Sequence, residues 1–464
     1  MSDNLLRLTK LEMTNFRCFR KMDKPIKFDP NLTVIVAKNG CGKTAVLDAI
    51  RISLGTFTKG LNRLSQAGIS RQDASLTPLR AGLGKGSDYP VSVKVEGFVD
   101  SQLCEWARVR GSEEGRTTTK EAQVISDFGT RLHKCVISDA CVMPELPILA
   151  FYGTGRLWKG ESMQEKGRSQ DKLAPAFENC FAGYEDALTA NSIYAQVKHW
   201  MMGADLCRNN PAEQETALGR STASQYKAVE SAVEMVLEAT KTQLGKLRTP
   251  HYNSQYGEMA LIDGRRGNDS AIAVPISWTS DGVKAAFSLV ADIAYRCARL
   301  NPAFGDDACR KTQGIVMIDE VDLFLHPSWQ QRILPDLRRI FPKIQFIVTT
   351  HSPQVISSVP PECIRIVDDN GKVEPVRTWT EGVESSRILK DVFGADPYAP
   401  KTLNNLRQRV DAFVDAVNAG RWNDPDVKKE GEELSAKFTG RDTDFDMARF
   451  RIEEEEWERD HASN

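Results

Sequence analysis

Apolar residues in the first 50 positions follow two different spacings. Residues 5–36 predict two strands joined by a turn, and the last part is the β-branched run Leu32–Val36. A glycine-rich turn follows, after which Thr44–Ile50 places its apolar residues at helical spacing. The chain therefore begins with the order strand, glycine turn, helix.

Further strand patterns follow later in the chain. Val91–Val95 alternates apolar and polar residues, which predicts a strand with one buried face. Residues 54–90 are rich in glycine, serine and lysine, and predict irregular structure. Continuous apolar runs are typical of strands buried on both faces, and we identify them at Pro147–Tyr152, Ile315–Ile318 and Phe346–Thr349.

Helical spacing dominates the remaining segments, at about 175–245, at 284–300 and after 380. No heptad pattern is sustained over several repeats, so a long coiled-coil arm is not expected. The mixture of buried strands and helices predicts an α/β fold. We expect a main domain over 1–378 with a mostly helical insertion at about 100–270, and a C-terminal helical domain over 379–464.

The composition excludes several classes of protein. Of the 464 residues, 41% are hydrophobic and 27% are charged, which is typical of a globular chain. Apolar stretches stay well below the ~18 residues of a membrane span, and the N-terminus lacks a secretory layout. The ten cysteines are scattered without a CxxC pair, which favours a reduced, cytoplasmic protein. Because the net charge is -2, any nucleic-acid contact needs a local basic patch.

The glycine turn after the first buried strand carries candidate phosphate-binding chemistry. Residues 37–44 match the phosphate-loop pattern, except that Ala37 stands in place of the first glycine. Glycines let backbone N–H groups surround phosphate oxygens, and the following helix adds the positive end of its dipole. The lysine supplies charge to the β- and γ-phosphates, and the threonine hydroxyl can bind Mg²⁺. The predicted ATP-binding residues here are Asn39, Gly40, Cys41, Gly42, Lys43, Thr44 and Ala45.

Two acids, Asp319 and Glu320, directly follow the apolar run Ile315–Ile318. A buried strand ending in Asp-Glu is the Walker B arrangement, in which the first acid holds Mg²⁺ and the second polarises the attacking water. We predict that Asp319 binds Mg²⁺ together with Thr44, and that Glu320 is the general base. Strands that end in surface acids are common, but the phosphate loop in the same chain favours the catalytic interpretation.

Two further polar sites follow the same logic. His351 comes just after the run Phe346–Thr349, where it can reach a γ-phosphate and sense hydrolysis. Ser280 is a good N-cap for the predicted helix, and Gly282 lets the backbone approach a ligand. A plain helix cap explains the last two residues equally well. The alternative is a motif that binds the γ-phosphate held by another subunit.

These motifs, in this order, resemble the ABC-type ATPase heads of the SMC/RecF superfamily. The resemblance implies that two heads sandwich two ATP molecules, so a homodimer or higher homo-oligomer is expected. It implies that Ser280 and Gly282 act on the nucleotide of the partner copy. It also makes Asp322 the D-loop residue and His351 the switch residue.

The sequence departs from this superfamily at two motifs. The signature reads Thr-Ser-Asp-Gly-Val-Lys in place of Leu-Ser-Gly-Gly-Gln. The Q-loop has only a weak candidate, Gln72. The phosphate loop and the Walker B acids are far apart in the sequence without a coiled-coil arm between them, which argues against an SMC protein.

A narrower resemblance covers most of the chain. The strings Ala150–Trp158, Ala291–Arg296 and Leu325–Gln330, and the stretch from Trp379 to Leu434, are similar to a group of bacterial stand-alone ATPases. That group includes PtuA of the Septu antiphage systems, which works with an HNH nuclease, PtuB. The resemblance implies an ATP-hydrolysing subunit that regulates a PtuB-like nuclease and reaches DNA through the complex.

The C-terminal part predicts no nuclease site of its own. Asp442-Thr443-Asp444 offers paired acids for a metal, but it lies in a polar stretch without a preceding strand, which favours a solvated turn. Exposed aromatic residues there, such as Trp422, Phe450 and Trp457, form a docking surface or pack on the ATPase domain. Two alternatives stay open: a RecF-like DNA-repair ATPase that clamps DNA without a nuclease, and a nucleotide-sensing scaffold with little turnover.

Overall fold

The computed structural model divides the chain into two compact units, Met1–Phe393 and Gly394–Asn464. The described residues are 4–38, 40–62, 67–78, 85–138, 143–155, 180–190, 194–209, 216–238, 247–263, 272–368, 371–395, 405–437 and 443–461.

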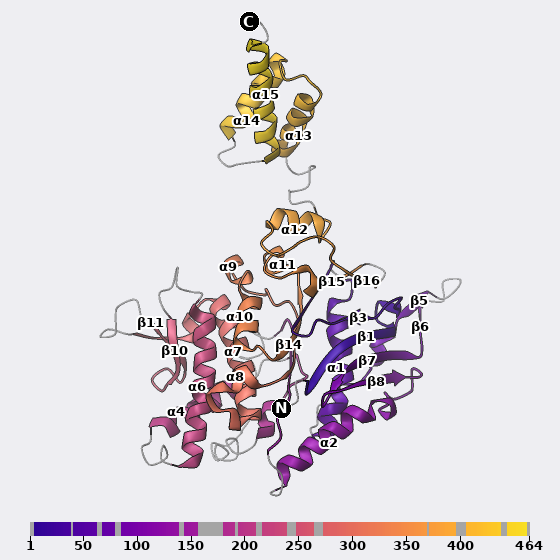
Figure 1. The fold of residues 1–464 in the computed structure, drawn as a ribbon, viewed down its shortest axis with the longest axis vertical. Helices are drawn as coiled ribbons and strands as arrows, with labels where there is room; N and C mark the ends of the chain where they lie inside the picture. Colours follow the sequence, from indigo (N-terminus) through magenta and orange to yellow (C-terminus); the bar gives the residue numbers. More distant parts are fainter. Residues whose placement is uncertain are drawn as a thin grey trace. The chain divides into compact units, whose positions relative to one another are not determined.

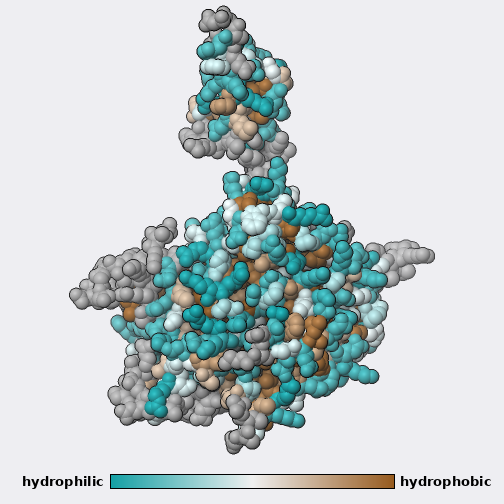
Figure 2. All heavy atoms as spheres, viewed as in Figure 1, coloured by the Kyte–Doolittle hydropathy of each residue, from teal (hydrophilic) through white to brown (hydrophobic). Residues whose placement is uncertain are grey.

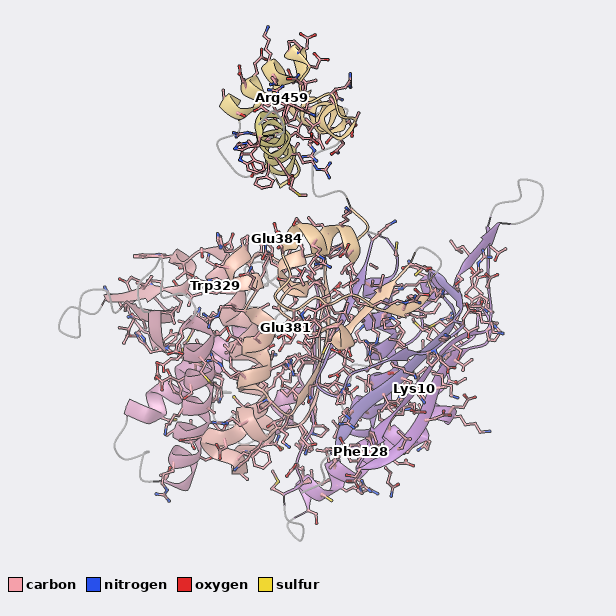
Figure 3. All side chains as sticks on the ribbon, turned by 45° about the horizontal axis from the view of Figure 1, so that its top comes forward. Lys10, Phe128, Trp329, Glu381, Glu384 and Arg459 are labelled. Carbon is pink, nitrogen blue, oxygen red and sulfur yellow. The ribbon has the colours of Figure 1, made fainter. Side chains whose placement is uncertain are left out.

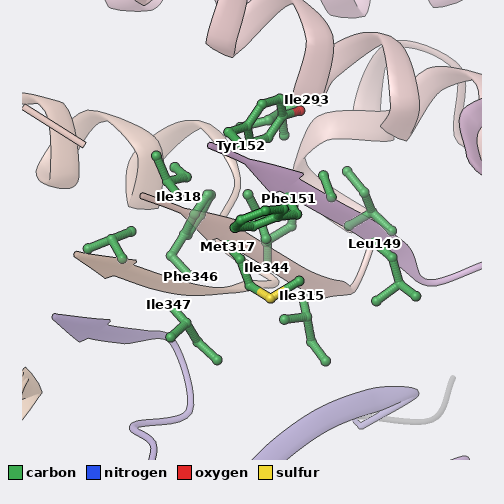
Figure 4. Close-up of a cluster of buried hydrophobic side chains, with 14 of the residues drawn as sticks. Leu149, Phe151, Tyr152, Ile293, Ile315, Met317, Ile318, Ile344, Phe346 and Ile347 are labelled. Carbon is green, nitrogen blue, oxygen red and sulfur yellow. The ribbon is translucent and has the colours of Figure 1, made fainter. Parts of the chain in front are cut away.

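A mostly parallel sheet of six strands forms the centre of the first unit (Figure 1). Its strands are fully buried runs at the centre, and only the edge pair β15–β16 is antiparallel. Figure 4 shows the apolar side chains that pack around β9, β13 and β14. In spatial order the strands are β16 (Val373–Pro375), β15 (Ile364–Val367), β4 (Leu32–Ala37), β14 (Ile344–Thr350), β13 (Gly314–Ile318) and β9 (Ile148–Tyr152).

A second, antiparallel sheet lies on the other side of helix α1 (Lys43–Gly60), which contacts strands of both sheets. Gln345 of β14 also ties the sheets together, because its amide exchanges hydrogen bonds of 2.9 Å with the backbone N–H and C=O of Leu8. This sheet contains β1 (Leu6–Phe16), β2 (Phe19–Lys21), β3 (Ile26–Lys27), β7 (Val91–Val99) and β8 (Gln102–Arg110).

Helices cover the remaining faces of the first unit. The long helix α7 (Asp281–Leu300) packs on α6 and on strand β9. The other helices are α2 (Gln123–Ile137), α4 (Tyr194–Asn209), α6 (Ala217–Leu237), α8 (Ala308–Lys311), α9 (Pro327–Gln330), α10 (Ile333–Ile340), α11 (Pro353–Ile356) and α12 (Ser385–Asp391). Two small sheets pair β5 (Leu76–Pro78) with β6 (Lys85–Ser87), and β10 (Leu247–Asn253) with β11 (Glu258–Asp263) and β12 (Ile272–Pro275).

Hydrophilic residues cover much of the face drawn in Figure 2. Within the described ranges, no helix is long and apolar enough to cross a membrane.

The second unit is a small bundle of α13 (Asn405–Asn418), α14 (Pro425–Lys437) and α15 (Thr443–His461). It has an apolar core of its own, in which the rings of Phe413 and Phe445 lie 5.3 Å apart. Arg409 of α13 also pairs with Glu430 and Glu433 of α14, at 2.6 and 2.8 Å.

Most of the predicted elements are confirmed, and two expectations were wrong. Residues 5–36 form four strands rather than two, because β2 and β3 are edge pairings of three and two residues, too short to show a pattern. The irregular region does not begin at 54, since α1 continues to Gly60. Leu54 and Phe57 are fully buried and extend the apolar face of this helix.

Candidate functional site

The phosphate loop connects β4 to α1. Gly40 and Gly42 have φ of 82° and 97°, a left-handed conformation that glycine adopts without strain. Ala37 is instead the last residue of β4, where an alanine side chain causes no backbone strain. This explains why the motif tolerates alanine at its first position. The Lys43 ammonium donates a 3.0 Å hydrogen bond to the Ala37 carbonyl and so lies across the loop. Asn39 lies outside the described residues.

The Walker B acid Asp319 is held from three directions. Its Oδ2 accepts a 2.9 Å hydrogen bond from the Thr44 hydroxyl, and its Oδ1 accepts one of 2.5 Å from the Thr349 hydroxyl. Its backbone N–H donates to the Tyr152 carbonyl at 2.8 Å. The side chain is only 4% exposed. The structure therefore brings together the two residues that the sequence predicts as metal ligands.

The spacing of these two oxygens fits a magnesium ion. Adjacent ligands of an octahedral Mg²⁺ with metal–oxygen distances of about 2.0–2.1 Å are about 2.9 Å apart. The Thr44 and Asp319 oxygens have that separation, and both are hard ligands. In the described ranges, no group of three or more His, Cys, Asp or Glu side chains could hold a metal. Magnesium at nucleotide sites commonly uses one or two carboxylates together with phosphate oxygens, and the pair fits this pattern.

The turn after β13 is fixed by the end of β14. The Glu320 N–H donates to the Thr349 hydroxyl at 2.8 Å, and Glu320 adopts a positive φ of 49°. The Thr350 hydroxyl donates to Asp322 at 2.5 Å. Thr349 and Thr350 were not among the predicted site residues. A signal was available, because parallel strands end at the same edge of a sheet and two threonines precede His351.

His351 lies in the electrostatic field of the same cluster. Partial burial lowers the pKa of its imidazole below the ordinary value, and the charge of Lys43 lowers that pKa further. The acids Glu320, Asp322 and Asp319 act in the opposite direction, but the net direction is downward. The imidazole is therefore neutral at pH 7, with one nitrogen able to donate a hydrogen bond and one able to accept.

Ser280 and Gly282 are placed at the N-terminus of α7. The exposed Ser280 hydroxyl accepts a 3.4 Å hydrogen bond from the Val283 N–H, so this residue is a helix cap. An ideal Cβ on Gly282 would lie 3.1 Å from the carbonyl oxygen of Phe324, in the turn that follows Asp322. Among the described residues, no hydrogen bond or ion pair joins Ser280 to the phosphate loop.

The Q-loop candidate Gln72 is exposed in a 3-10 turn at Arg71–Asp73. Its neighbour Asp73 forms a 2.8 Å ion pair with Arg17, and Arg17 also pairs with Asp48 of α1 at 2.7 Å. This turn is thus tied to the helix that follows the phosphate loop. Asp442, in the candidate acidic turn, lies outside the described residues.

The two glycines of the phosphate loop offer a matched test of local packing. We expect Gly42→Ala to lower the free energy of unfolding by about 2–3 kcal/mol or more, because a Cβ there adds strain at positive φ and meets Cys18 Sγ at 2.5 Å and the Phe19 ring at 2.8 Å. Gly40→Ala has open space and adds only strain, about 1 kcal/mol. Denaturant unfolding without nucleotide measures both. Equal losses would contradict the contact made by Gly42.

Two protein-family models match the chain, one in each half of the ATPase unit. A model described as an AAA domain matches residues 10–199, and a second, described as an AAA domain, putative AbiEii toxin, Type IV TA system, matches residues 220–357. The chain is 26% identical to the retron Ec83 probable ATPase of Escherichia coli, over 98% of this chain and 88% of that protein. It is 24% identical to the retron Vc95 probable ATPase of Vibrio cholerae serotype O1 biovar El Tor, over 78% and 74%.

A shorter match is with the Septu protein PtuA of Bacillus thuringiensis, 35% identical over 23% of this chain and 28% of that protein. Among solved structures, the SMC head bound to the C-winged helix domain of ScpA covers 80% of this chain and 97% of its own, at 14% identity and a TM-score of 0.44. The chain is thus similar to ATPases along most of its length and resembles PtuA over a shorter stretch, and its parallel sheet with a phosphate loop after β4 is the α/β fold of an ABC-type P-loop ATPase.

Proposed function

We propose that this ATPase binds and hydrolyses ATP at a site shared by two copies of the chain, and that its nucleotide state controls an HNH nuclease in an antiphage complex. The observation that carries the ATP site is the run of contacts from Thr44 through Asp319 to Thr349, which places the phosphate loop beside both Walker B acids. Similarity to two retron probable ATPases and to PtuA supports the setting in defence.

The residues have distinct roles in this mechanism. Lys43 and the N–H groups of the phosphate loop bind the β- and γ-phosphates, and Lys43 releases the Ala37 carbonyl when it does so. Thr44 and Asp319 would hold Mg²⁺, which would supply positive charge beside the phosphates. Glu320 accepts the proton of the attacking water, and Thr349 orients its backbone. Neutral His351 donates a hydrogen bond to a γ-phosphate oxygen.

Ser280 and Gly282 complete the site on the other copy. Both residues lie at the start of α7, and the exposed Ser280 is free to face another chain. The first N–H groups of a 20-residue helix form an anion-binding end with a positive dipole. Because Gly282 contacts the segment after Asp322, closure of two heads would bring this helix end and the D-loop to the partner's γ-phosphate together.

The C-terminal unit offers a surface for the nuclease. Helix α15 buries one face, with Phe445 and Ala448, in its own bundle. A second face carries Met447, Phe450 and Trp457, which are 61%, 66% and 62% exposed. We call these three residues the α15 stripe. A helix needs only one apolar face to fold, so the stripe is an exposed apolar surface of the kind that marks an interaction site.

The charge around the α15 stripe selects the partner. Glu454 lies on the same face, between Phe450 and Trp457, within the acidic run Glu453–Glu456. Parallel, in-register pairing of two copies of α15 would place these acids against one another, which is unfavourable. Arg459 does not offset them on this face, since its guanidinium lies over the Trp422 ring, 5.6 Å from the ring centroid. A basic, apolar segment of the nuclease fits the stripe.

Co-expression with a PtuB-like HNH nuclease tests the partner. We expect Phe450→Glu/Trp457→Glu to lower the recovered nuclease at least tenfold, because buried aromatic anchors at interfaces are each worth about 2 kcal/mol or more. ATP hydrolysis and helix content should stay unchanged. Glu455→Ala, exposed on the same helix but off the stripe, is the control. Full recovery with the double variant would exclude the stripe, and failure of the native chain to capture any nuclease would exclude the partner.

A further inference from the structure

Helix α7 touches the ATP site at two separate points. Its first turn, at Gly282, lies against the Phe324 carbonyl in the turn after the Walker B acids. Farther along, the helix packs on β9, the strand that pairs with β13. Figure 4 shows Ile293 of α7 beside Tyr152, at the end of β9. The helix therefore connects the predicted signature residues to the strand next to Asp319.

A buried ion pair lies at the second contact. Asp292 and Arg296, one turn apart on α7, are 1% and 2% exposed, and the Arg296 Nε lies 3.3 Å from an Asp292 oxygen. Burial raises the pKa of Asp292, against the effect of the arginine charge. Removing two charges from water is costly, and apolar side chains of similar size often give equal or greater stability. Stability alone does not account for this pair.

Arg296 also fixes the chain next to β9. Its guanidinium donates to the carbonyls of Gly183 and Glu185, at 2.8 and 3.0 Å. That segment in turn bonds to β9, since the Phe151 N–H donates to the Ala187 carbonyl at 2.8 Å. One arginine thus holds α7, the 183–187 segment and, through that segment, the end of β9.

Tyr152 connects this network to Asp319, which follows β13. Its ring is buried, and its hydroxyl lies beside the Asp292 carboxylate and the Arg296 guanidinium, with burial and the Asp292 charge both raising its pKa. Its carbonyl accepts the 2.8 Å hydrogen bond from the Asp319 N–H. The same residue therefore has its buried side chain beside the ion pair and its backbone carbonyl bonded to Asp319.

We propose that Asp292, Arg296 and Tyr152 are positioning residues that couple the orientation of α7 to the position of Asp319. The proposal rests on the shared ATP site, in which the start of α7 contacts the nucleotide of the partner copy. Contact between the start of α7 and the partner's nucleotide would then change the position of Asp319, the metal-binding acid of the same chain. The coupling acts on hydrolysis and leaves nucleotide binding by the phosphate loop intact.

Two variants separate positioning from simple packing. Asp292→Leu/Arg296→Met replaces the pair by apolar residues of similar size, so it should still fold, with a melting temperature lowered only by the loss of the two hydrogen bonds from Arg296 to the 183–187 segment. Misplacing a reacting group by a fraction of an ångström is sufficient to lower kcat by about tenfold, and we expect that loss with KM and ATP affinity within about twofold of the native values. Tyr152→Phe should lower kcat by about threefold to fivefold.

Tyr226→Phe is the matched control, because Tyr226 is also fully buried and its hydroxyl bonds to the Pro250 carbonyl, outside this network. It should keep the native kcat. A folded Asp292→Leu/Arg296→Met protein with native kcat would overturn the proposal, and so would a parallel loss of kcat and ATP affinity. A native chain whose turnover does not depend on Glu320 would instead contradict the proposed function.

Discussion

Glu320→Gln will bind ATP with nearly native affinity and will hydrolyse it at least 10²–10³-fold more slowly, because a general base contributes about that factor. The amide is the same size as the carboxylate, and the backbone of residue 320 stays held by Thr349 at 2.8 Å. The change therefore removes the proton acceptor without moving the loop. With ATP and Mg²⁺ the protein should accumulate as a closed dimer.

Single-turnover hydrolysis and light scattering with ATP measure these two effects. Glu384→Gln is the control, because Glu384 is exposed at the start of α12 in the same unit (Figure 3). It should leave turnover and oligomeric state unchanged. Native turnover in Glu320→Gln would exclude Glu320 as the base, even if the variant still bound ATP.

Lys43→Ala will lose ATP binding by about 10²-fold or more, since a charged hydrogen bond to a phosphate contributes about 2–3 kcal/mol. Without nucleotide, the ammonium is held by the Ala37 carbonyl, and burial lowers the pKa of Lys43 despite the nearby acids. The burial of this charge is unfavourable to the empty protein, so its removal should not reduce the free energy of unfolding.

Titration with a fluorescent ATP analogue measures the loss, and denaturant unfolding checks the fold. Lys59→Ala is the matched control, because Lys59 is exposed in the last turn of the same helix. It should bind nucleotide normally. Retained binding in Lys43→Ala would mean that phosphates are held elsewhere, and the phosphate loop would then be only a structural turn.

The sequence predicted the parts of the site that are local in the chain. Lys43 and Thr44 sit between a strand and a helix, and Asp319 and Glu320 end a buried strand, as their patterns require. These motifs can be recognised in the sequence because each one consists of residues that are neighbours in the chain. Known chemistry led us to expect Thr44 and Asp319 close together, and a 2.9 Å hydrogen bond joins their side chains. Their role as metal ligands stays a prediction.

The contacts between strands were not predictable in the same way. Tyr152 and Thr349 hold Asp319 only because β9 and β14 flank β13, and this order is a property of the whole sheet. The sequence pattern places Asp292 and Arg296 in a predicted helix and gives no sign that they are buried. Their burial depends on β9 and the 183–187 segment, which come from another part of the chain.

The central claim, a site shared by two copies, is tested most directly by mixing two inactive variants. Lys43→Ala lacks the phosphate loop charge, and Ser280→Arg blocks the helix end that faces the partner. A mixed dimer of the two contains one intact site, so an equal mixture should recover about a quarter of native ATP hydrolysis if the dimer is symmetric. Activity no higher than the mean of the separate variants would contradict the account.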